Sequence, residues 1–282
     1  MIIWIASYPK SGNTWIRSFL ISLMLKNDAK FKLNDLENIK QFPSKSQYIQ
    51  YGINIDFNNF QEVSKYWIKV QERINFDNKL RFFKTHNALC KIGNNFFTDM
   101  KNTLGVIYIV RDPRNIITSL KNHYHHTNLE ESKIFMFDES KGIKNATGNG
   151  KIIFPQVLGS WKTHYNSWKN LNKNYLLIKY ENLLCAPQEE FRKVVDYLNK
   201  VIGLRFEDEQ ITRAINLSSF ENLKTLEKNE GFAESVKDLK TGERKKFFFL
   251  GPNNNWQKLL NTKISHSIVE EFKNEMKELG YI

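Results

Sequence analysis

The sequence predicts an α/β protein with a central parallel sheet flanked by helices, because one local pattern occurs twice. An apolar run at residues 1–6 is followed by a polar turn at 7–13 and an amphipathic stretch at 14–26. A second apolar, β-branched run at 104–110 passes through Arg-Asp-Pro into another amphipathic stretch. Strands that are apolar on both faces and alternate with helices favour a parallel sheet covered on both sides.

The remaining elements follow from the same periodicities. Asp112 can cap the helix after the second strand, and Pro113 fits its first turn. We expect shorter strands at residues 80–84 and 175–179, and helices at 156–171, 187–201, 207–217 and 265–279. Since the chain has no internal repeat and no long linker, we expect one domain over residues 1–282, with capping or lid segments at 28–79, 126–151 and 227–246. The alternative for each segment is solvated surface.

The composition is that of a folded protein and excludes several classes. The 282 residues are 41% hydrophobic and 26% charged, unlike a disordered, coiled-coil or fibrous chain. No apolar run approaches the ~20 residues of a membrane span, and residues 2–6 are too few for a signal-peptide core. We therefore expect a cytoplasmic protein without a membrane span. Cys90 and Cys185 are too few for a disulfide framework or a structural zinc site.

The net charge of +12 suggests an anionic partner, such as nucleic acid, an acidic membrane surface or a phosphorylated small molecule. The lysines are dispersed along the chain and are not gathered in one stripe. A coding bias toward Lys, Asn and Ile would give the same excess, so the charge alone does not decide between these partners.

The segment Tyr-Pro-Lys-Ser-Gly-Asn-Thr-Trp at residues 8–15 lies between the first strand and its helix. The first N–H groups of a helix are unpaired, and its dipole favours an anion there. Gly12 lets the backbone approach a ligand, and Lys10 brings a mobile charge. Ser11 and Thr14 add hydroxyls. The segment indicates a phosphate-binding loop, although not the GxxxxGK[ST] type, since the lysine precedes the only glycine. The alternative is a plain turn with a surface lysine.

The second chemical motif is Arg-Asp-Pro-Arg at the end of the strand 104–110. The planar guanidinium of Arg111 suits bidentate phosphate binding, and Ser119 follows two helical turns later. Both lie where the carboxyl end of a strand meets a ligand. We expect Arg114, in contrast, to be an exposed residue at the start of the helix.

The third motif is Lys84-Thr85-His86, at the end of a short strand. An imidazole can accept the proton of a hydroxyl near neutral pH, and a lysine can neutralise developing negative charge. The cluster of His123, His125 and His126 lacks a nearby carboxylate or cysteine pattern, so we expect no metal site there.

In this order the three motifs closely resemble those of the cytosolic-type sulfotransferases, whose loop reads Tyr-Pro-Lys-Ser-Gly-Thr-Thr-Trp. Only Asn13 departs, and its amide can still donate to an oxyanion. Members of this family transfer a sulfuryl group from 3′-phosphoadenosine 5′-phosphosulfate (PAPS) to a hydroxyl or amine. The resemblance implies the P-loop-kinase-like sulfotransferase fold, PAPS as co-substrate, no metal, and in-line transfer to a small acceptor. Aromatic residues between positions 31 and 83 favour an aromatic or lipidic acceptor, unless they are ordinary packing.

The resemblance also implies roles for individual residues. His86 would be the general base, Lys10 would stabilise the leaving phosphate oxygen, and Lys84 would neutralise the sulfuryl oxygens. Arg111 and Ser119 would hold the 3′-phosphate. The full set of implied donor-binding residues is Lys10, Ser11, Gly12, Asn13, Thr14, Trp15, Arg111, Ser119, Tyr180, Ser218, Phe220, Leu250 and Gly251. Of these, Trp15, Tyr180 and Phe220 would contact the adenine, although Trp15 could equally be a core aromatic.

The chain departs from the family pattern near its end. Where the family has Phe-Arg-Lys-Gly-x-x-Gly-x-Trp, this chain keeps Gly251 and Trp256 but has Phe249-Leu250 in place of the Arg-Lys pair that binds the 3′-phosphate. We hypothesise that the basic triplet at 244–246 closes over this phosphate instead. The alternative is a solvated basic turn. The family's dimer motif is not recognisable, so the sequence leaves the oligomeric state open.

Two other functions compete with sulfuryl transfer. A metal-dependent phosphoryl-transfer enzyme on the same fold would need a lysine after the glycine run and a metal-binding carboxylate, and the sequence offers neither. A basic nucleic-acid-binding protein without turnover would bind with steep salt dependence and little preference for one mononucleotide. We expect no nucleic-acid partner.

Overall fold

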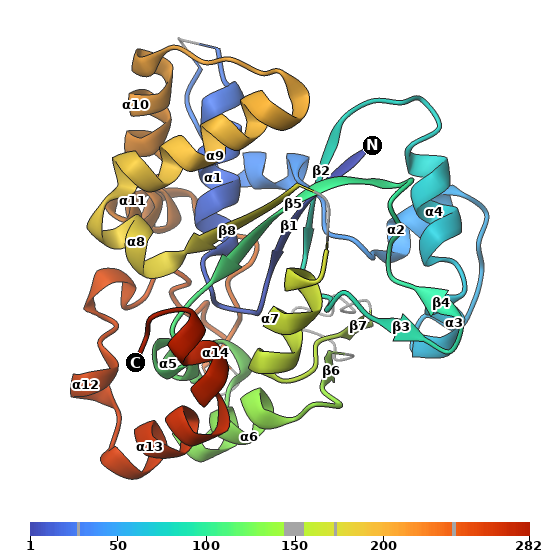
Figure 1. Ribbon diagram of the computed structural model, residues 1–282. Coiled ribbons are helices and arrows are strands. Elements are labelled where there is room, and N and C mark those ends of the chain that lie inside the picture. The colour runs from blue at the N-terminus through green and yellow to red at the C-terminus, as the bar shows by residue number, and fades with distance from the viewer. Residues whose placement is uncertain (27–28, 144–154, 172–173, 239–240) are drawn as a thin grey trace.

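The computed structural model describes residues 1–26, 29–143, 155–171, 174–238 and 241–282, and its centre is a four-stranded sheet (Figure 1). The strands are β1 (Ile2–Ser7), β2 (Arg81–Thr85), β5 (Thr103–Val110) and β8 (Tyr175–Lys179). They are arranged in the order β2-β1-β5-β8, and every neighbouring pair is parallel. This confirms the predicted α/β class with a central parallel sheet.

Helices cover both faces of the sheet, because the strands are apolar on both faces. Trp4 belongs to one buried cluster together with side chains of α5 (Pro113–Tyr124) and α7 (Trp161–Lys169). Ile5, its neighbour in β1, belongs to a second cluster with α1 (Asn13–Met24) and α9 (Pro187–Ile202). Because successive side chains of a strand point to opposite faces of the sheet, the single apolar run of β1 contributes to both cores.

The other elements are shorter or lie at the periphery of the sheet. They are η1 (Leu33–Asn38), α2 (Lys45–Gln50), α3 (Phe60–Ser64), α4 (Trp67–Ile74), β3 (Lys91–Ile92), β4 (Asn95–Phe96), α6 (Leu129–Phe137), β6 (Gly142–Ile143), β7 (Gln156–Val157), α8 (Tyr180–Cys185), α10 (Asp208–Leu217), α11 (Phe220–Glu230), η2 (Gly251–Asn253), α12 (Trp256–Leu259), α13 (Thr262–Glu271) and α14 (Lys273–Glu278). No helix among the described residues combines the length and apolar character that crossing a bilayer requires.

Two predicted helices have different bounds in the structure. The helix expected at 156–171 starts later, because Gln156 and Val157 pair with β6, and Ser160 caps α7 by accepting a hydrogen bond from the Thr163 amide at 3.2 Å. The helix expected at 265–279 is two helices, because the backbone leaves the helical conformation at the fully buried Phe272.

The expectation of an exposed Arg114 is wrong. Its guanidinium pairs with Asp112 at 2.7 Å and stacks on the Trp256 ring at 4.0 Å. It also donates a hydrogen bond to the Tyr281 carbonyl oxygen at 2.8 Å. Residues near the C-terminus therefore cover the start of α5. The local sequence pattern at the start of a helix cannot show that residues far along the chain will bury it. The predicted cap is present, since Asp112 accepts from the Arg114 amide.

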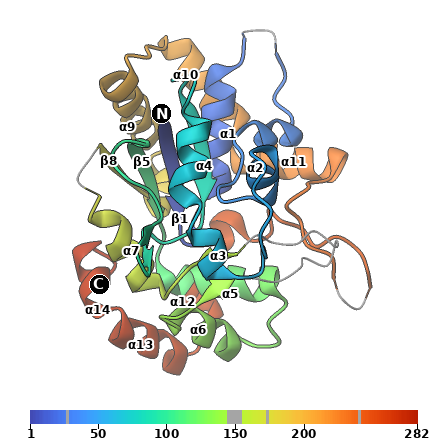
Figure 2. The ribbon, with the colours of Figure 1, turned by 90° about the vertical axis from the view of Figure 1, so that its right-hand side faces the viewer.

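The segment 28–79 is more than solvated surface. Phe42, Tyr48 and Trp67 are fully buried in the same cluster as Trp4. The helices α2 and α4 of this segment lie on the side of the molecule that faces the viewer in Figure 2. Of the three predicted capping segments, residues 28, 144–151 and 239–240 lie outside the described part of the chain.

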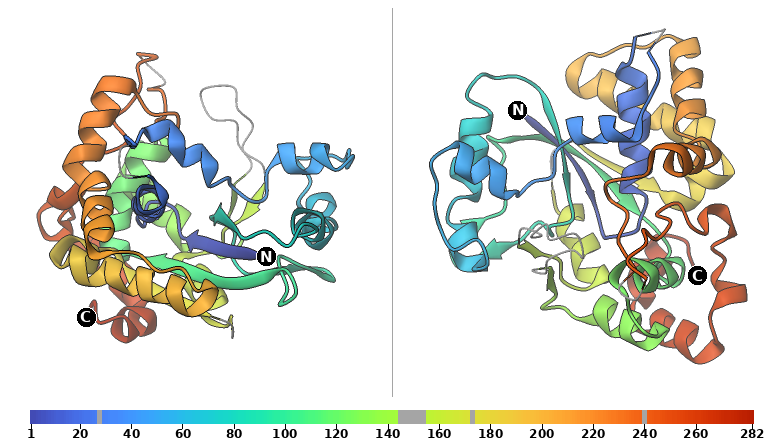
Figure 3. Two further views of the ribbon diagram at one scale, coloured as in Figure 1. Left: turned by 90° about the horizontal axis from the view of Figure 1, so that it is seen from above. Right: turned by 180° about the vertical axis from the view of Figure 1, so that it is seen from behind.

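The parallel sheet gathers the motif-bearing loops at one edge. The chain leaves β1 toward β2 on one side and later places β5 on the other, so a topological switch point lies between β1 and β5. Ligands of open α/β sheets bind at the carboxyl ends of strands at such a point. The chain that follows α11 runs past α1 toward α5 (Figure 3), which places a further segment over this edge.

Candidate active site

A cavity of about 720 Å³ opens at this edge and gathers side chains from all three motifs. Its wall contains most of the predicted site residues: Lys10, Gly12, Asn13, Thr14, Trp15, Lys84, His86, Arg111, Ser119, Tyr180, Phe220, Leu250 and Gly251.

The loop after β1 has a backbone that few residues could adopt. Gly12 has φ 109°, and a Cβ there would lie 2.7 Å from Cδ2 of Tyr180. Lys10 has φ 66°, a left-handed conformation that is uncommon for a side-chain-bearing residue and is typical of functional loops. Asn13 fastens the loop to β1, because its Nδ2 donates to the Ile5 carbonyl oxygen at 2.9 Å. Its amide is therefore engaged by the protein and is not directed at an oxyanion, contrary to expectation.

Lys10 lies in a desolvated, cationic environment. Its Nζ stands 3.9 Å from the centroid of the Phe247 ring. Burial, together with the charges of Arg111 and Lys84, lowers the pKa of Lys10 to about 8, against the opposing effects of Glu234 and Glu227. An anion bound here would restore the favourable environment of the ammonium group.

The tautomer of His86 follows from its hydrogen bond. Its Nδ1 is 2.8 Å from the Ser7 carbonyl oxygen, which can only accept, so Nδ1 carries the proton. This leaves the lone pair on Nε2 free in a side chain that lines the cavity. Burial, and then the charge of Lys84, lowers the pKa of His86 to about 3, which keeps the imidazole neutral.

A chain of buried hydrogen bonds holds the backbone carbonyl group of His86 in place. Nε2 of His164 lies 3.2 Å from the His86 carbonyl oxygen and must donate to it. Nδ1 of His164 therefore accepts from the Tyr108 hydroxyl at 2.8 Å. His164 is a fully buried, satisfied histidine with a structural part in positioning the end of β2.

The pKa of Lys10, about 8, and that of His86, about 3, predict an unusual pH profile for turnover. If turnover uses His86 as a base and Lys10 as a cation, kcat/KM for the donor should stay level as the pH falls from about 8 to about 6, because the imidazole of His86 stays unprotonated throughout that range. It should decline above about pH 8, where Lys10 loses its charge. The pH dependence of kcat/KM for the donor would check this profile, because it reports the pKa values of the protein before the donor binds. An acid limb with an apparent pKa near the ordinary ~6.5 of histidine would contradict it.

Arg111 and two aromatic rings form the wall on the β8 side. The Arg111 guanidinium stacks on the Tyr180 ring at 4.1 Å and donates to the Lys10 carbonyl oxygen at 3.1 Å. Trp15 meets Tyr180 edge-on, with ring centroids 5.6 Å apart. This part of the cavity offers flat apolar surfaces beside a fixed cation.

Another part of the wall is formed by residues that follow the basic triplet. Leu250 and Gly251 line the cavity, and a Cβ on Gly251 would lie 2.2 Å from Cζ of Phe220. Asn254 ties this segment to α5, because its Nδ2 donates to the Ser119 Oγ at 3.3 Å. The Ser119 hydroxyl thus lies in the cavity and has a partner from a segment 135 residues away.

Several predicted residues do not reach the cavity wall. Ser11 is buried below the loop, and the hydroxyl of the buried Ser218 donates to the Ile215 carbonyl oxygen at 3.2 Å. Arg244 faces its own segment, donating to the Phe232 carbonyl oxygen at 2.9 Å, and Lys245 pairs with Asp238 at 3.3 Å. The triplet 244–246 therefore closes a turn next to the cavity and does not line it.

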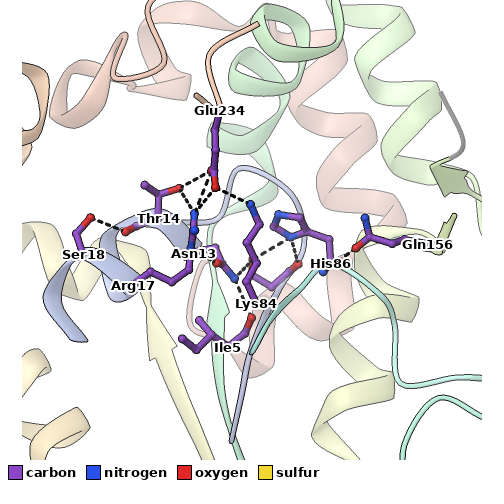
Figure 4. Close-up of polar contacts among 10 residues, drawn as sticks. Ile5, Asn13, Thr14, Arg17, Ser18, Lys84, His86, Gln156 and Glu234 are labelled. Carbon is purple, nitrogen blue, oxygen red and sulfur yellow. Dashed lines mark hydrogen bonds and ion pairs between the residues drawn. The ribbon is translucent and has the colours of Figure 1, made fainter. Parts of the chain in front are cut away.

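The structure also brings in residues that the sequence analysis missed. Glu234 and Arg17 line the cavity and form an ion pair at 2.8 Å (Figure 4). His123 lines it as well, and burial lowers its pKa well below the ordinary value. The one signal available in the sequence was Arg17, a charged residue three positions after Thr14 on an otherwise apolar helix, which could have been recognised as part of the site. The described residues contain no group of three or more His, Cys, Asp or Glu side chains placed to hold a metal ion.

Comparison with known proteins identifies the family to which the chain is similar. Residues 2–280 match the family model described as sulfotransferase domain. Cytosolic sulfotransferase 17 of Arabidopsis thaliana is 23% identical over 99% of this chain and 75% of its own length. Among solved structures, mouse sulfotransferase SULT7A1 complexed with PAP has a TM-score of 0.59 at 19% identity, covering 98% of this chain and 84% of that one. Retinol dehydratase in a complex with retinol and PAP has a TM-score of 0.62 at 19% identity, covering 98% and 81%.

Proposed function

The chain belongs to the sulfotransferase domain family, and we propose that it transfers the sulfuryl group of PAPS to a hydroxyl or amine of a small acceptor. The observation that supports this most is the convergence of Lys10, from the loop after β1, with Lys84 and His86, from the end of β2, on the wall of one cavity. Two cations beside a neutral base fit a reaction in which negative charge develops on a leaving group while a proton is removed.

The cavity suits an anionic nucleotide. Trp15 and Arg111 line the cavity, and Trp15 Nε1 and Arg111 Nε are buried and have no hydrogen-bond partner among the described residues. Such groups are costly to leave unpaired, so polar groups of a ligand would satisfy them. We propose that Lys10 and Thr14 hold the 5′-phosphosulfate, Arg111 and Ser119 the 3′-phosphate, and Trp15, Tyr180 and Phe220 the adenine. When bound, PAPS supplies a sulfuryl group already attached to a good leaving group.

The protein residues then divide the work of the transfer. Nε2 of His86 takes the proton of the acceptor hydroxyl as the oxygen–sulfur bond forms. Lys10 stabilises the phosphate oxygen that leaves with the electron pair of the broken sulfur–oxygen bond, so that adenosine 3′,5′-bisphosphate is released. Lys84 neutralises the sulfuryl oxygens during this in-line displacement.

We propose an aromatic or lipidic acceptor, a single functional domain and a cytosolic location. Tyr124 and Ile143 add apolar surface to the cavity, and retinol dehydratase is a neighbour crystallised with retinol, a lipidic alcohol. The cytosolic location rests on the name of the plant relative.

Calorimetric binding of four ligands tests the proposal against its competitors. We expect adenosine 3′,5′-bisphosphate to bind more tightly than adenosine 5′-monophosphate, Mg-ATP or a short single-stranded DNA. A preference for Mg-ATP would favour phosphoryl transfer. Equal, steeply salt-dependent binding of all four would favour a nucleic-acid-binding protein.

Selectivity for the 3′-phosphate should depend on Arg111 and Ser119. Losing a buried charged hydrogen bond costs about 1.5–3 kcal/mol, so the double variant Arg111→Ala/Ser119→Ala should lose roughly 10-fold or more of its preference for the bisphosphate over the monophosphate. Lys246→Ala is the control, because it removes a charge from an exposed residue that does not line the cavity. Unchanged discrimination in the double variant would place the 3′-phosphate elsewhere.

A further inference from the structure

Glu234 belongs to the chain that follows α11, and its side chain lines the cavity. Its carboxylate accepts from Nη2 of Arg17 at 2.8 and 3.0 Å and from Nζ of Lys84 at 3.0 Å, and lies 3.5 Å from the Thr14 hydroxyl (Figure 4). Glu234 therefore links α1, which carries Arg17, to β2, which carries Lys84, beside the loop at residues 8–15.

The two cations need an anion. The side chain of Arg17 is 2% exposed and that of Lys84 is 13% exposed, and a buried charge without a partner is strongly destabilising. Glu234 supplies the neutralising charge, because it forms an ion pair with each of them. Although burial raises its pKa, the charges of Arg17 and Lys84 outweigh this effect and hold the pKa below the ordinary value. The carboxylate is accordingly ionised.

The same groups are those that the donor would use. Thr14 and Lys84 are proposed contacts of the phosphosulfate, and two anions cannot occupy one position. We propose that Glu234 is an internal competitor of the donor, whose carboxylate fills the anion position between Thr14, Arg17 and Lys84 and must leave it when the phosphosulfate binds. This inference rests on the proposed function. It also makes Arg17 a further donor-binding residue once the carboxylate has left.

The backbone around Glu234 is held, so that its side chain can move alone. Arg244 donates to the carbonyl oxygens of Phe232 at 2.9 Å and of Ser235 at 3.2 Å. The Ser235 hydroxyl donates to Glu227 at 2.8 Å. With the residues on both sides fixed, rotation about the side-chain bonds of Glu234 is enough to vacate the position. Arg244 thus acts on the site by holding the segment that carries Glu234.

Removing the competing charge should tighten the binding of ligands that carry a 5′-anion. We expect Glu234→Gln to bind adenosine 3′,5′-bisphosphate roughly tenfold more tightly than the wild-type chain, which corresponds to about 1.4 kcal/mol. Binding of adenosine 3′-monophosphate, which has no 5′-anion, should not change. Glu37→Gln is the matched control, because Glu37 is an exposed carboxylate on the same cavity wall. Calorimetry with both nucleotides on all three proteins makes the measurement.

Each outcome decides between distinct possibilities. Equal or weaker binding of the bisphosphate by Glu234→Gln would overturn the inference and make Glu234 a residue that positions Lys84. An equal gain in Glu37→Gln would overturn it too, since the effect would then act through space. If the wild-type chain shows no preference for the bisphosphate over adenosine 5′-monophosphate, the proposed function fails first.

A second variant covers the case in which Glu234→Gln does not fold, since it leaves two buried cations unpaired. Glu234→Asp keeps the charge but withdraws it by one methylene group, and we expect it to bind the bisphosphate more tightly than wild type by a smaller factor. Its melting temperature should rise further on adding the bisphosphate than that of the wild-type chain. An equal or smaller rise, with equal or weaker affinity, would overturn the inference.

Discussion

Replacement of His86 by alanine is expected to lower the turnover number by roughly 10²- to 10⁴-fold, the contribution of one general base. The affinity for adenosine 3′,5′-bisphosphate should barely change, because the role proposed for Nε2 is toward the acceptor proton. The reason lies in the geometry: Nδ1 is committed to the Ser7 carbonyl oxygen, so that Nε2 alone presents a lone pair to the cavity. Steady-state kinetics with labelled donor, together with calorimetry, make the measurement.

Two further variants separate chemistry from structure at this position. His86→Asn can keep a hydrogen bond to the Ser7 carbonyl oxygen but has no basic nitrogen, so it should be as slow as His86→Ala. His266→Ala, at an exposed position on α13, should retain full turnover. Near-normal turnover in a pure, folded preparation of His86→Asn would remove His86 from the role of base.

Replacement of Lys10 by methionine is expected to lower the turnover number by roughly 10²- to 10³-fold while weakening bisphosphate binding much less. Charge on the bridging oxygen grows only as the bond to sulfur breaks, so a cation placed there acts more strongly in the transition state than in the ground state. Methionine keeps an unbranched apolar side chain beside Phe247 and removes the charge.

The kinetic pattern distinguishes the possible roles of Lys10. Lys40→Ala is the control, because it removes the same charge from an exposed position on the cavity rim. If Lys10→Met weakened only donor binding and kept its rate at saturation, Lys10 would be a tether for the donor and not a group that stabilises the transition state.

The parts of the fold that the sequence could predict are those governed by short-range patterns. The strand–loop–helix unit around residues 8–15 follows from an apolar run, a polar turn and an amphipathic helix. Asp112 and Pro113 mark the start of α5 in the same local way. The break at Phe272 between α13 and α14 has no such signal, because it depends on how one buried ring packs against the rest of the core.

The same distinction between short-range patterns and long-range contacts applies to the residues of the candidate site. Lys10, Lys84 and His86 could be named because each lies at or shortly after the carboxyl end of a strand, and parallel strands bring such positions to one edge. Glu234 could not, because its partner Arg17 is 217 residues away and the residues around it show only a charged segment. Arg114 was misjudged for a related reason, since Trp256 and Tyr281 cover it from the far end of the chain.

The most direct test of sulfuryl transfer is a labelled-donor experiment with the wild-type chain and His86→Ala side by side. PAPS labelled with ³⁵S would be incubated with pooled phenols, lipid alcohols, sugars and peptides, and both the labelled products and adenosine 3′,5′-bisphosphate would be quantified. The account predicts label in an organic acceptor, an equal amount of the bisphosphate, and the loss of both with His86→Ala. Tight bisphosphate binding without any labelled organic product, or release of the label only as inorganic sulfate at the same rate in both proteins, would contradict it.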